Sequence, residues 1–193
     1  MNYVIFDLEY TAWEGMERRL KFAEREVIQI GAIKINFDDI DINIISTFQE
    51  FVKPTVNPQL SDYIINLTGI TQQNVEEQGL TLLEALNKFE IFCSYGKNKT
   101  FSWGDDSRTI KKNTELIGIE FPSFLANNTD LTSRIPMIID QYDLNVSSGN
   151  LYRSVGLNLE FKNHDALDDT KSIFETLKFL HLNKKIDLTY VLK

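Results

Sequence analysis

Extended apolar runs dominate the first quarter of the chain. Residues 3–6 form a short apolar stretch, residues 27–35 are almost continuously apolar, and residues 42–52 form a further extended run. β-Branched and aromatic residues of this kind favour strands. The polar segment 36–39 lies between the second and third runs and predicts a hairpin. We therefore expect three strands first, arranged as an antiparallel meander.

Helical spacing replaces this pattern after residue 53. Pro54 and Pro58 mark a loop, and short helical pieces are expected around residues 59–67 and 71–77. A longer amphipathic helix is predicted where apolar side chains recur every three or four residues, at Leu82, Ala85, Leu86, Phe89, Phe92 and Cys93.

Two more strands and two more helices are expected further along the chain. Residues 100–103 predict a fourth strand that ends at Gly104, followed by a helix that starts at Asp105 or Asp106. Residues 129–132 predict a short fifth strand. A long C-terminal helix is predicted by the spacing of Leu167, Thr170, Phe174 and Leu177. Strands followed by alternating helices and strands indicate an α/β fold, with helices packed on a mixed sheet.

Length and composition indicate one globular domain. The chain has 193 residues, 42% hydrophobic and 25% charged, so we expect residues 1–193 to form a single domain with a substantial core. No segment approaches the ~20 apolar residues that span a bilayer, so no membrane association is expected, and the first residues lack the basic flank of a secretory signal. The single cysteine, Cys93, agrees with a reducing compartment, so a cytoplasmic location is expected.

The net charge narrows the classes of function. With 20 Lys and Arg against 28 Asp and Glu, the net charge is −8. Proteins that coat nucleic acid usually carry excess positive charge. An enzyme that holds only a strand end is not excluded, since carboxylates repel phosphate only until cations bind them.

Asp7 and Glu9 form the first candidate site. Residues two apart on a strand point to the same face, so their carboxylates would lie side by side at the end of an apolar strand. A divalent cation between them would stabilise such a pair. Acids at a strand end that reaches solvent are also common, so this pair alone does not establish a metal site.

Two further acidic groups stand at helix starts. Asp105 and Asp106 follow the fourth strand, and capping alone would account for them. His164 stands before a helix whose first turns carry three acids, and its imidazole, with an ordinary pKa of ~6.5, could accept a proton from water. Spacing does not decide whether Asp168 or Asp169 would be the ligand.

Together these groups resemble the DnaQ-like exonuclease superfamily, in the branch defined by four acids and a histidine. The first motif is matched by residues 6–11, the second by residues 103–106 with Ile110, and the third by the His-x-Ala-Leu-x-Asp pattern of residues 164–169. This resemblance places the family aspartates at Asp106 and Asp169. Residues 26–32 resemble the second strand of the family, and residues 51–54 and 67–71 are similar to the subgroup with KapD and the Eri-type RNA exonucleases. The resemblance is weakest over residues 12–24 and 121–150.

The resemblance implies a fold and a reaction. The fold would be RNase H-like, a mixed five-stranded sheet with helices on both faces. The reaction would be 3′→5′ exonucleolytic hydrolysis of single-stranded nucleic acid, RNA more than DNA, which releases nucleoside 5′-monophosphates. Two Mg²⁺ or Mn²⁺ ions ~3.5–4 Å apart would be held by Asp7, Glu9, Asp106 and Asp169, with His164 as general base.

Contacts to the nucleic-acid strand are also predicted. Trp13 could stack on a terminal base, Thr68 would lie near the 3′ end, and Arg108 and Lys111 share a helix face that could follow the phosphates. Ordinary core and surface positions would explain the same residues. The acidic balance predicts distributive trimming, with a possible helper protein that supplies basic surface. The competing interpretations are a DNA proofreading or repair exonuclease and a non-catalytic adaptor with the nuclease fold.

Overall fold

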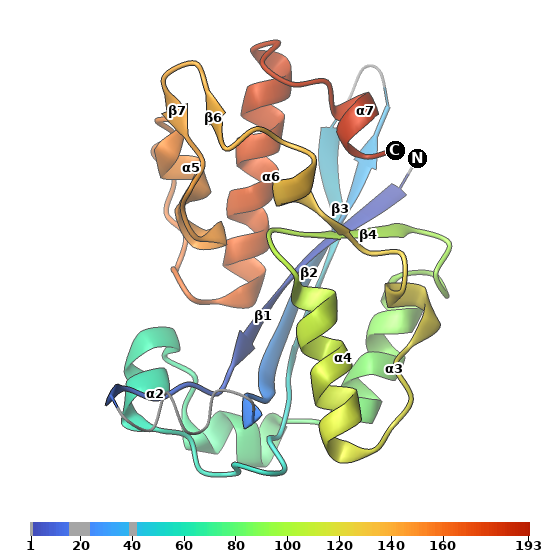
Figure 1. Ribbon diagram of the computed structural model, residues 1–193, viewed down its shortest axis with the longest axis vertical. Coiled ribbons are helices and arrows are strands. Elements are labelled where there is room, and N and C mark those ends of the chain that lie inside the picture. Colours follow the sequence, from blue (N-terminus) through green and yellow to red (C-terminus); the bar gives the residue numbers. More distant parts are fainter. Residues whose placement is uncertain (1, 16–23, 39–41) are drawn as a thin grey trace.

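The computed structural model describes residues 2–15, 24–38 and 42–193, and Figure 1 shows how its strands and helices are arranged. Three long strands come first: β1 (Asn2–Tyr10), β2 (Val27–Phe37) and β3 (Ile42–Phe51). β2 pairs antiparallel with both of the others. The predicted meander is therefore confirmed, although Asp39 of the polar segment 36–39 and most of the weakly matching segment 12–24 lie outside the described residues.

Two short strands complete the sheet. β4 (Lys99–Ser102) pairs parallel with β1, and β5 (Thr129–Asp130) pairs parallel with β4, which gives the order β3-β2-β1-β4-β5. The predicted mixed five-stranded sheet is confirmed. β5 covers only the first half of the expected segment 129–132, because a 3₁₀ turn begins at Leu131.

The helices agree with the predicted pattern where that pattern is long. They are α2 (Asp62–Thr68), α3 (Leu82–Phe92), α4 (Asp106–Ile117), α5 (Leu151–Ser154), α6 (Ala166–Leu182) and α7 (Leu188–Val191), and a π-helical turn covers Asn74–Gln78. The sequence did not predict α5, α7 or the hairpin of β6 (Ile138–Ile139) and β7 (Tyr142–Asp143). Elements of two to four residues are too short to show a hydrophobic period. No helix in the described ranges has the length and apolar character to cross a membrane.

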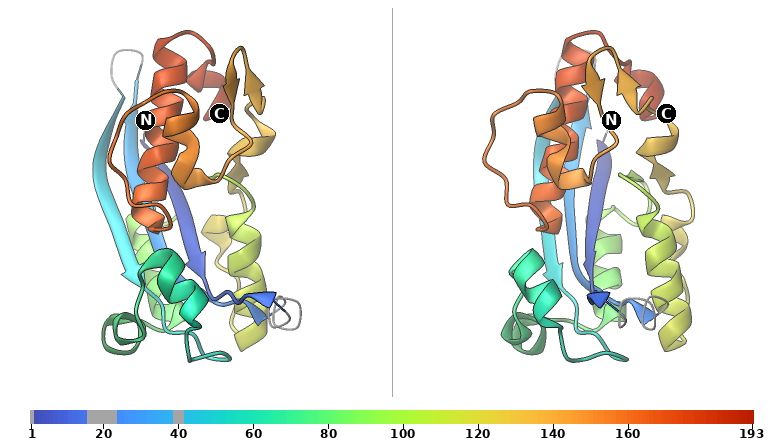
Figure 2. Two further views of the ribbon diagram at one scale, coloured as in Figure 1. Left: turned by 90° about the vertical axis from the view of Figure 1, so that its left-hand side faces the viewer. Right: turned by 60° about the vertical axis from the view of Figure 1, so that its left-hand side comes forward.

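Helices cover both faces of the sheet, as expected (Figures 1 and 2). Successive side chains of a strand point to opposite faces. On β1, Tyr3 and Ile5 pack in the cluster that contains α6 residues, whereas Val4, Phe6 and Leu8 pack with residues of α3 and α4. The odd-numbered positions of β1 therefore face α6, and the even-numbered positions face α3 and α4.

One edge of β1 is only partly paired. β4 pairs with β1 from Tyr3 to Ile5 and ends at Ser102, so within the described sheet the second half of β1 has no neighbour on that side. Side chains from both faces of the sheet can reach this free edge. The candidate active site lies there.

Candidate active site

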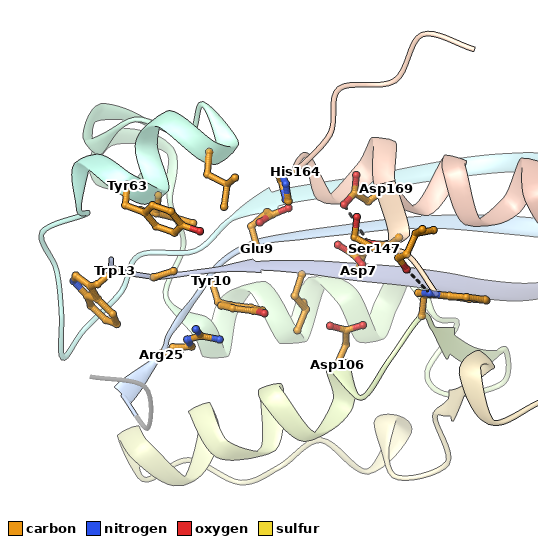
Figure 3. A pocket seen from close by; sticks show the side chains of 17 residues that line it. Asp7, Glu9, Tyr10, Trp13, Arg25, Tyr63, Asp106, Ser147, His164 and Asp169 are labelled. Carbon is orange, nitrogen blue, oxygen red and sulfur yellow. Dashed lines mark hydrogen bonds between the residues drawn. The ribbon is translucent and has the colours of Figure 1, made fainter. Parts of the chain in front are cut away.

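A pocket of about 480 Å³ follows the free edge of β1, and Figure 3 shows it from close by. Four successive β1 residues, 7–10, line it. All five residues that the family resemblance implies as catalytic line the same pocket: Asp7, Glu9, Asp106, His164 and Asp169. They come from β1, from the start of α4, and from α6 and the segment that leads into it, so the fold brings together residues that are distant in sequence.

Asp7 and Glu9 lie side by side because both occupy odd-numbered positions of β1. Their side chains therefore point toward the face that α6 covers, as Figure 3 shows. Asp7 is 6% exposed and Glu9 is 7% exposed, so neither is a carboxylate at a solvated strand end. Burial removes the simplest non-functional explanation of this pair, because an ionised carboxylate out of water needs a partner.

Two glutamines fix the start of α6 to the sheet. Gln29 of β2 accepts a hydrogen bond from the backbone N–H of Ala166 at 2.8 Å. Gln49 of β3 donates to the carboxylate of Asp165 at 3.0 Å, and Asp165 in turn caps the helix. These bonds determine where the first turn of α6, which carries Asp169, lies relative to β1.

Gly31 allows α6 to approach the sheet backbone directly. A Cβ at this position would lie 2.2 Å from backbone atoms of Ala166 and Leu167. Gly31 is also the residue paired with Asp7 across the β1–β2 ladder. The absence of a side chain at this one position therefore brings the start of α6 against the sheet beside Asp7.

His164 precedes α6 in an unusual backbone conformation. Its φ is 60°, a value that few residues other than glycine adopt and that is found repeatedly at functional sites. The imidazole is partly buried, and this burial lowers its pKa below the ordinary value of 6.5. The ring is therefore neutral at physiological pH and has a nitrogen free to accept a proton.

The structure distinguishes the two adjacent aspartates of α6. Asp168 accepts hydrogen bonds from the backbone N–H of Lys162 at 2.9 Å and from the ammonium of Lys171 at 2.7 Å, and it does not line the pocket. Asp169 is 4% exposed and lines the pocket with Asp7 and Glu9. Sequence spacing left both open as ligands, and only Asp169 has a suitable position.

Asp106 approaches the pocket from the other face of the sheet. It is the first residue of α4, the helix packed opposite α6. The turn before it passes through Gly104, whose φ of +111° would strain any other residue. The N–H of Gly104 donates to Asp130 of β5 at 3.0 Å, which fixes this turn. Asp106 therefore faces the other carboxylates across the free edge of β1 (Figure 3).

All four carboxylates have raised pKa values. Burial raises the pKa of Glu9 to about 8 and those of Asp106 and Asp169 to about 7, and neighbouring carboxylates add to the effect. The pKa of Asp7 is raised well above 3.8, first by burial and then by the charges of Asp106, Asp169 and Glu9. Without a cation, the cluster favours bound protons over ionised oxygens.

The donor set fits a divalent cation. Glu9, His164 and Asp169 each place one potential ligand atom within 4.8 Å of the others. Asp169 Oδ1 is buried and makes no hydrogen bond in the described structure. A buried carboxylate oxygen without a partner is costly, and a cation would satisfy it. The carboxylates of Asp7 and Asp106 supply further hard oxygen donors around the same pocket.

The four residues predicted to contact substrate fall into two groups. Trp13 lines the pocket and is 5% exposed. Thr68 is fully buried, where its hydroxyl donates to Ile64 O at 2.8 Å and accepts from the N–H of Ile70 at 3.0 Å. Arg108 and Lys111 are exposed on α4 and do not line the pocket. The fold thus brings only Trp13 of this group into the pocket.

Three further residues extend the pocket beyond the carboxylates. Tyr10, Arg25 and Tyr63 line it, and Figure 3 shows them with Trp13 on the side away from Asp169. The Arg25 guanidinium lies over the Tyr10 ring, 5.1 Å from its centroid. Among the described residues that line the pocket, Arg25 is the only lysine or arginine. No sequence pattern singled it out, because it belongs to a segment where basic and acidic residues balance.

Comparison with known proteins gives consistent results. The RNase_T exonuclease family model matches residues 4–177. 3′-5′ exoribonuclease 1 of Rattus norvegicus is 26% identical over 177 residues, which cover 88% of this chain and 50% of that protein. The probable 3′-5′ exonuclease KapD of Bacillus subtilis is 25% identical over 208 aligned positions, with 100% of this chain and 97% of that protein covered. The chain thus spans about half the length of the exoribonuclease 1 relatives.

Solved structures share the fold. The nuclease domain of 3′hExo, a DEDDh family member, bound to rAMP, gives a TM-score of 0.78 at 24% identity, covering 100% of this chain and 94% of that one. Cell-death related nuclease 4 gives a TM-score of 0.77 at 21% identity, covering 94% of this chain and 64% of that one. The RNase H-like fold and the family resemblance inferred from the motifs are thus confirmed. Since the family model includes β1, α4 and most of α6, which together carry the carboxylates, the chain belongs to the RNase T exonuclease family.

Proposed function

We propose that this chain is a metal-dependent 3′→5′ exonuclease that removes nucleotides from the 3′ ends of single-stranded nucleic acid. One observation carries the proposal: three buried carboxylates and the partly buried Asp106, from three elements, meet around one pocket that also contains a histidine. Buried carboxylates at short range repel one another unless cations neutralise them. A module that only binds protein or RNA would gain nothing from this arrangement.

The placement of the side chains suggests their roles. Two Mg²⁺ or Mn²⁺ ions would bind. Glu9 and Asp169 would hold the first, Asp106 would support the second, and Asp7 would lie between them. Divalent ions bound there supply charge stabilisation for the phosphate and raise the acidity of a nearby water. His164, neutral because its pKa is lowered, would accept the proton of the attacking water on a ring nitrogen. Each turnover would release a nucleoside 5′-monophosphate.

RNA is the favoured substrate. Support comes from the relatives, whose names describe exoribonucleases, and from the 3′hExo nuclease domain, whose solved structure contains rAMP. DNA is the second candidate, because E. coli exonuclease I, which shares the fold, has been solved with single-stranded DNA. Trp13 would stack on a base in the pocket, and Arg108 and Lys111 would meet the strand outside it. Thr68 would act on the 3′ end only indirectly, since its hydroxyl is buried.

The charge of the molecule suggests how it works. The net charge is −8, and Arg25 is the one basic side chain among the described residues that line the pocket. We therefore expect weak, salt-sensitive, distributive trimming. A helper protein would then supply the missing basic surface. We further propose that residues 1–193 act as a single exonuclease domain in the cytoplasm, in keeping with the one buried, unpaired cysteine.

Hydrolysis assays on matched oligonucleotides test the proposal. Single-stranded RNA and DNA with free 3′ ends would be incubated with the protein in Mn²⁺, in Mg²⁺ and in EDTA. We expect stepwise shortening that requires the cation, proceeds faster on RNA, and is abolished in Asp7→Asn but not in the surface control Asp187→Asn. If wild-type protein shortens neither substrate with either cation, the exonuclease proposal is wrong and the adaptor interpretation is favoured.

A further inference from the structure

The 3₁₀ turn Ser148–Asn150, just before α5, contacts the carboxylate of Asp169. The Ser148 hydroxyl donates to Asp169 Oδ2 at 3.2 Å. Gly149 lies so close that a Cβ there would be 2.4 Å from Asp169 Oδ1. Both oxygens of this carboxylate therefore depend on the two residues at the start of the turn.

The same turn is fixed to the helix that carries Asp169. Ser172, three residues further along α6, donates from its hydroxyl to the backbone carbonyl of Ser148 at 2.6 Å. The hydroxyl of Ser172 also accepts from the N–H of Tyr152 at 3.3 Å. Ser172 and Tyr152 are both buried. The distance from the turn to Asp169 is thus set by bonds within a short stretch of α6, and not by a mobile loop.

The two oxygens of Asp169 have different surroundings. Oδ2 receives the hydrogen bond from Ser148. Oδ1 is buried and has no hydrogen-bond partner among the described residues. Glu9 and His164 each place a potential ligand atom within 4.8 Å of an oxygen of this carboxylate. The turn therefore bonds one oxygen and encloses the other, which has no hydrogen bond.

We propose that Ser148 and Gly149 are positioning residues that hold the Asp169 carboxylate beside Glu9 and His164, where the divalent cation would bind. The inference rests on the proposed function, since it concerns the same cation site. Hydrogen bonds that orient a ligating carboxylate usually change cation affinity or activity by about 10–100-fold when they are removed. Ser148 supplies such a bond, and Gly149 supplies the space that the carboxylate needs.

Gly149→Ala tests whether the Asp169 carboxylate needs the space beside Gly149. Gly149 is not among the glycines with positive φ, so its backbone accepts an alanine. The added Cβ would meet the end of the Asp169 side chain, which can rotate, and no backbone atom lies nearer. We therefore expect a stable protein whose cation affinity falls by about 10–100-fold. A substitution that acted only on the fold would lower stability without this selective loss.

Ser148 substitutions test the hydrogen bond. Ser148→Ala removes the donor and should lower cation affinity by about 10–100-fold, whereas Ser148→Thr keeps a hydroxyl and should restore most of it. Ser154→Ala is the matched control, because the Ser154 hydroxyl donates to the carbonyl of Leu151 at 2.7 Å and contacts none of the carboxylates. The control should bind the cation as wild type does.

The experiment measures Mn²⁺ affinity of the purified full chain by calorimetry, with thermal unfolding in EDTA as the check on folding. Selective loss of affinity in Gly149→Ala and Ser148→Ala, with recovery in Ser148→Thr, would support the inference. Unchanged affinity in both loss variants would overturn it, even if wild type binds Mn²⁺ and hydrolyses RNA. Should Gly149→Ala not fold, the comparison of Ser148→Ala with Ser148→Thr decides. Wild-type protein without Mn²⁺ affinity would instead reject the proposed function, and the inference with it.

Discussion

Replacing Glu9 by glutamine should change the stability of the metal-free protein in a pH-dependent way. Burial, followed by the negative charges of Asp169, Asp165 and Asp106, raises the Glu9 pKa from 4.5 to about 8. Because the folded pKa lies above the unfolded one, folding favours the protonated form. Stability is therefore fully present below pH 4.5 and is lost as the pH rises toward 8.

The size of this effect follows from the two pKa values. For each pH unit between the unfolded and folded pKa values, the free energy of unfolding falls by at most about 1.4 kcal/mol. The upper limit of the stability lost through ionisation of Glu9 is therefore about 5 kcal/mol. That is comparable with the total stability of many domains, about 5–15 kcal/mol. Glutamine is similar in shape and does not titrate, so Glu9→Gln should be more stable than wild type by several kcal/mol at about pH 9, and by little at about pH 5.

The assay is urea unfolding in EDTA at several pH values, followed by the same series with Mn²⁺. A cation at 100 times its Kd stabilises the folded state by about 2.7 kcal/mol. Wild type should gain this stabilisation, whereas Glu9→Gln should gain less because it lacks a ligand oxygen. Equal pH dependence of the two proteins in EDTA would refute the reasoning, since it would mean that Glu9 is not desolvated in the folded state.

Three other substitutions have defined outcomes. Gly31→Ala should lower the free energy of unfolding in urea by about 1–3 kcal/mol and kcat about 10²-fold, because the added Cβ would force α6 away from the sheet. A wild-type kcat in this variant would show that the close approach is unimportant for catalysis. His164→Ala should lower kcat by about 10²–10⁴-fold, and an unchanged rate would make the assignment of His164 as general base wrong. In wild type the acidic limb of the pH–rate profile should lie below pH 6.5, because burial lowers the His164 pKa. Arg25→Gln should reduce the slope of log binding constant against log salt concentration by about 0.7 for a single-stranded oligonucleotide, measured in Ca²⁺ to prevent turnover. An unchanged slope would exclude a phosphate contact by Arg25.

The amino-acid sequence determined the long elements and the identity of the acidic motifs. β2 and β3 were predictable from their long apolar runs, and α3 and α6 from apolar side chains at helical spacing. Alternation along β1 was enough to place Asp7 and Glu9 on one face. Two-residue strands and one-turn helices between residues 138 and 154 show no period, so neither they nor the turn at Ser148 could be inferred.

Which side chains share the pocket depends on how the elements pack against one another. Asp168 and Asp169 are equivalent in sequence spacing, and the Lys162 and Lys171 contacts separate them. Arg25 lines the pocket while Arg108 does not, although Arg108 is the one that follows an acidic motif in the sequence. The reason is physical: local periodicity reports which face of an element is buried, whereas the meeting of residues far apart in sequence depends on how elements pack, and here that packing depends on one missing Cβ at Gly31 and on the early end of β4.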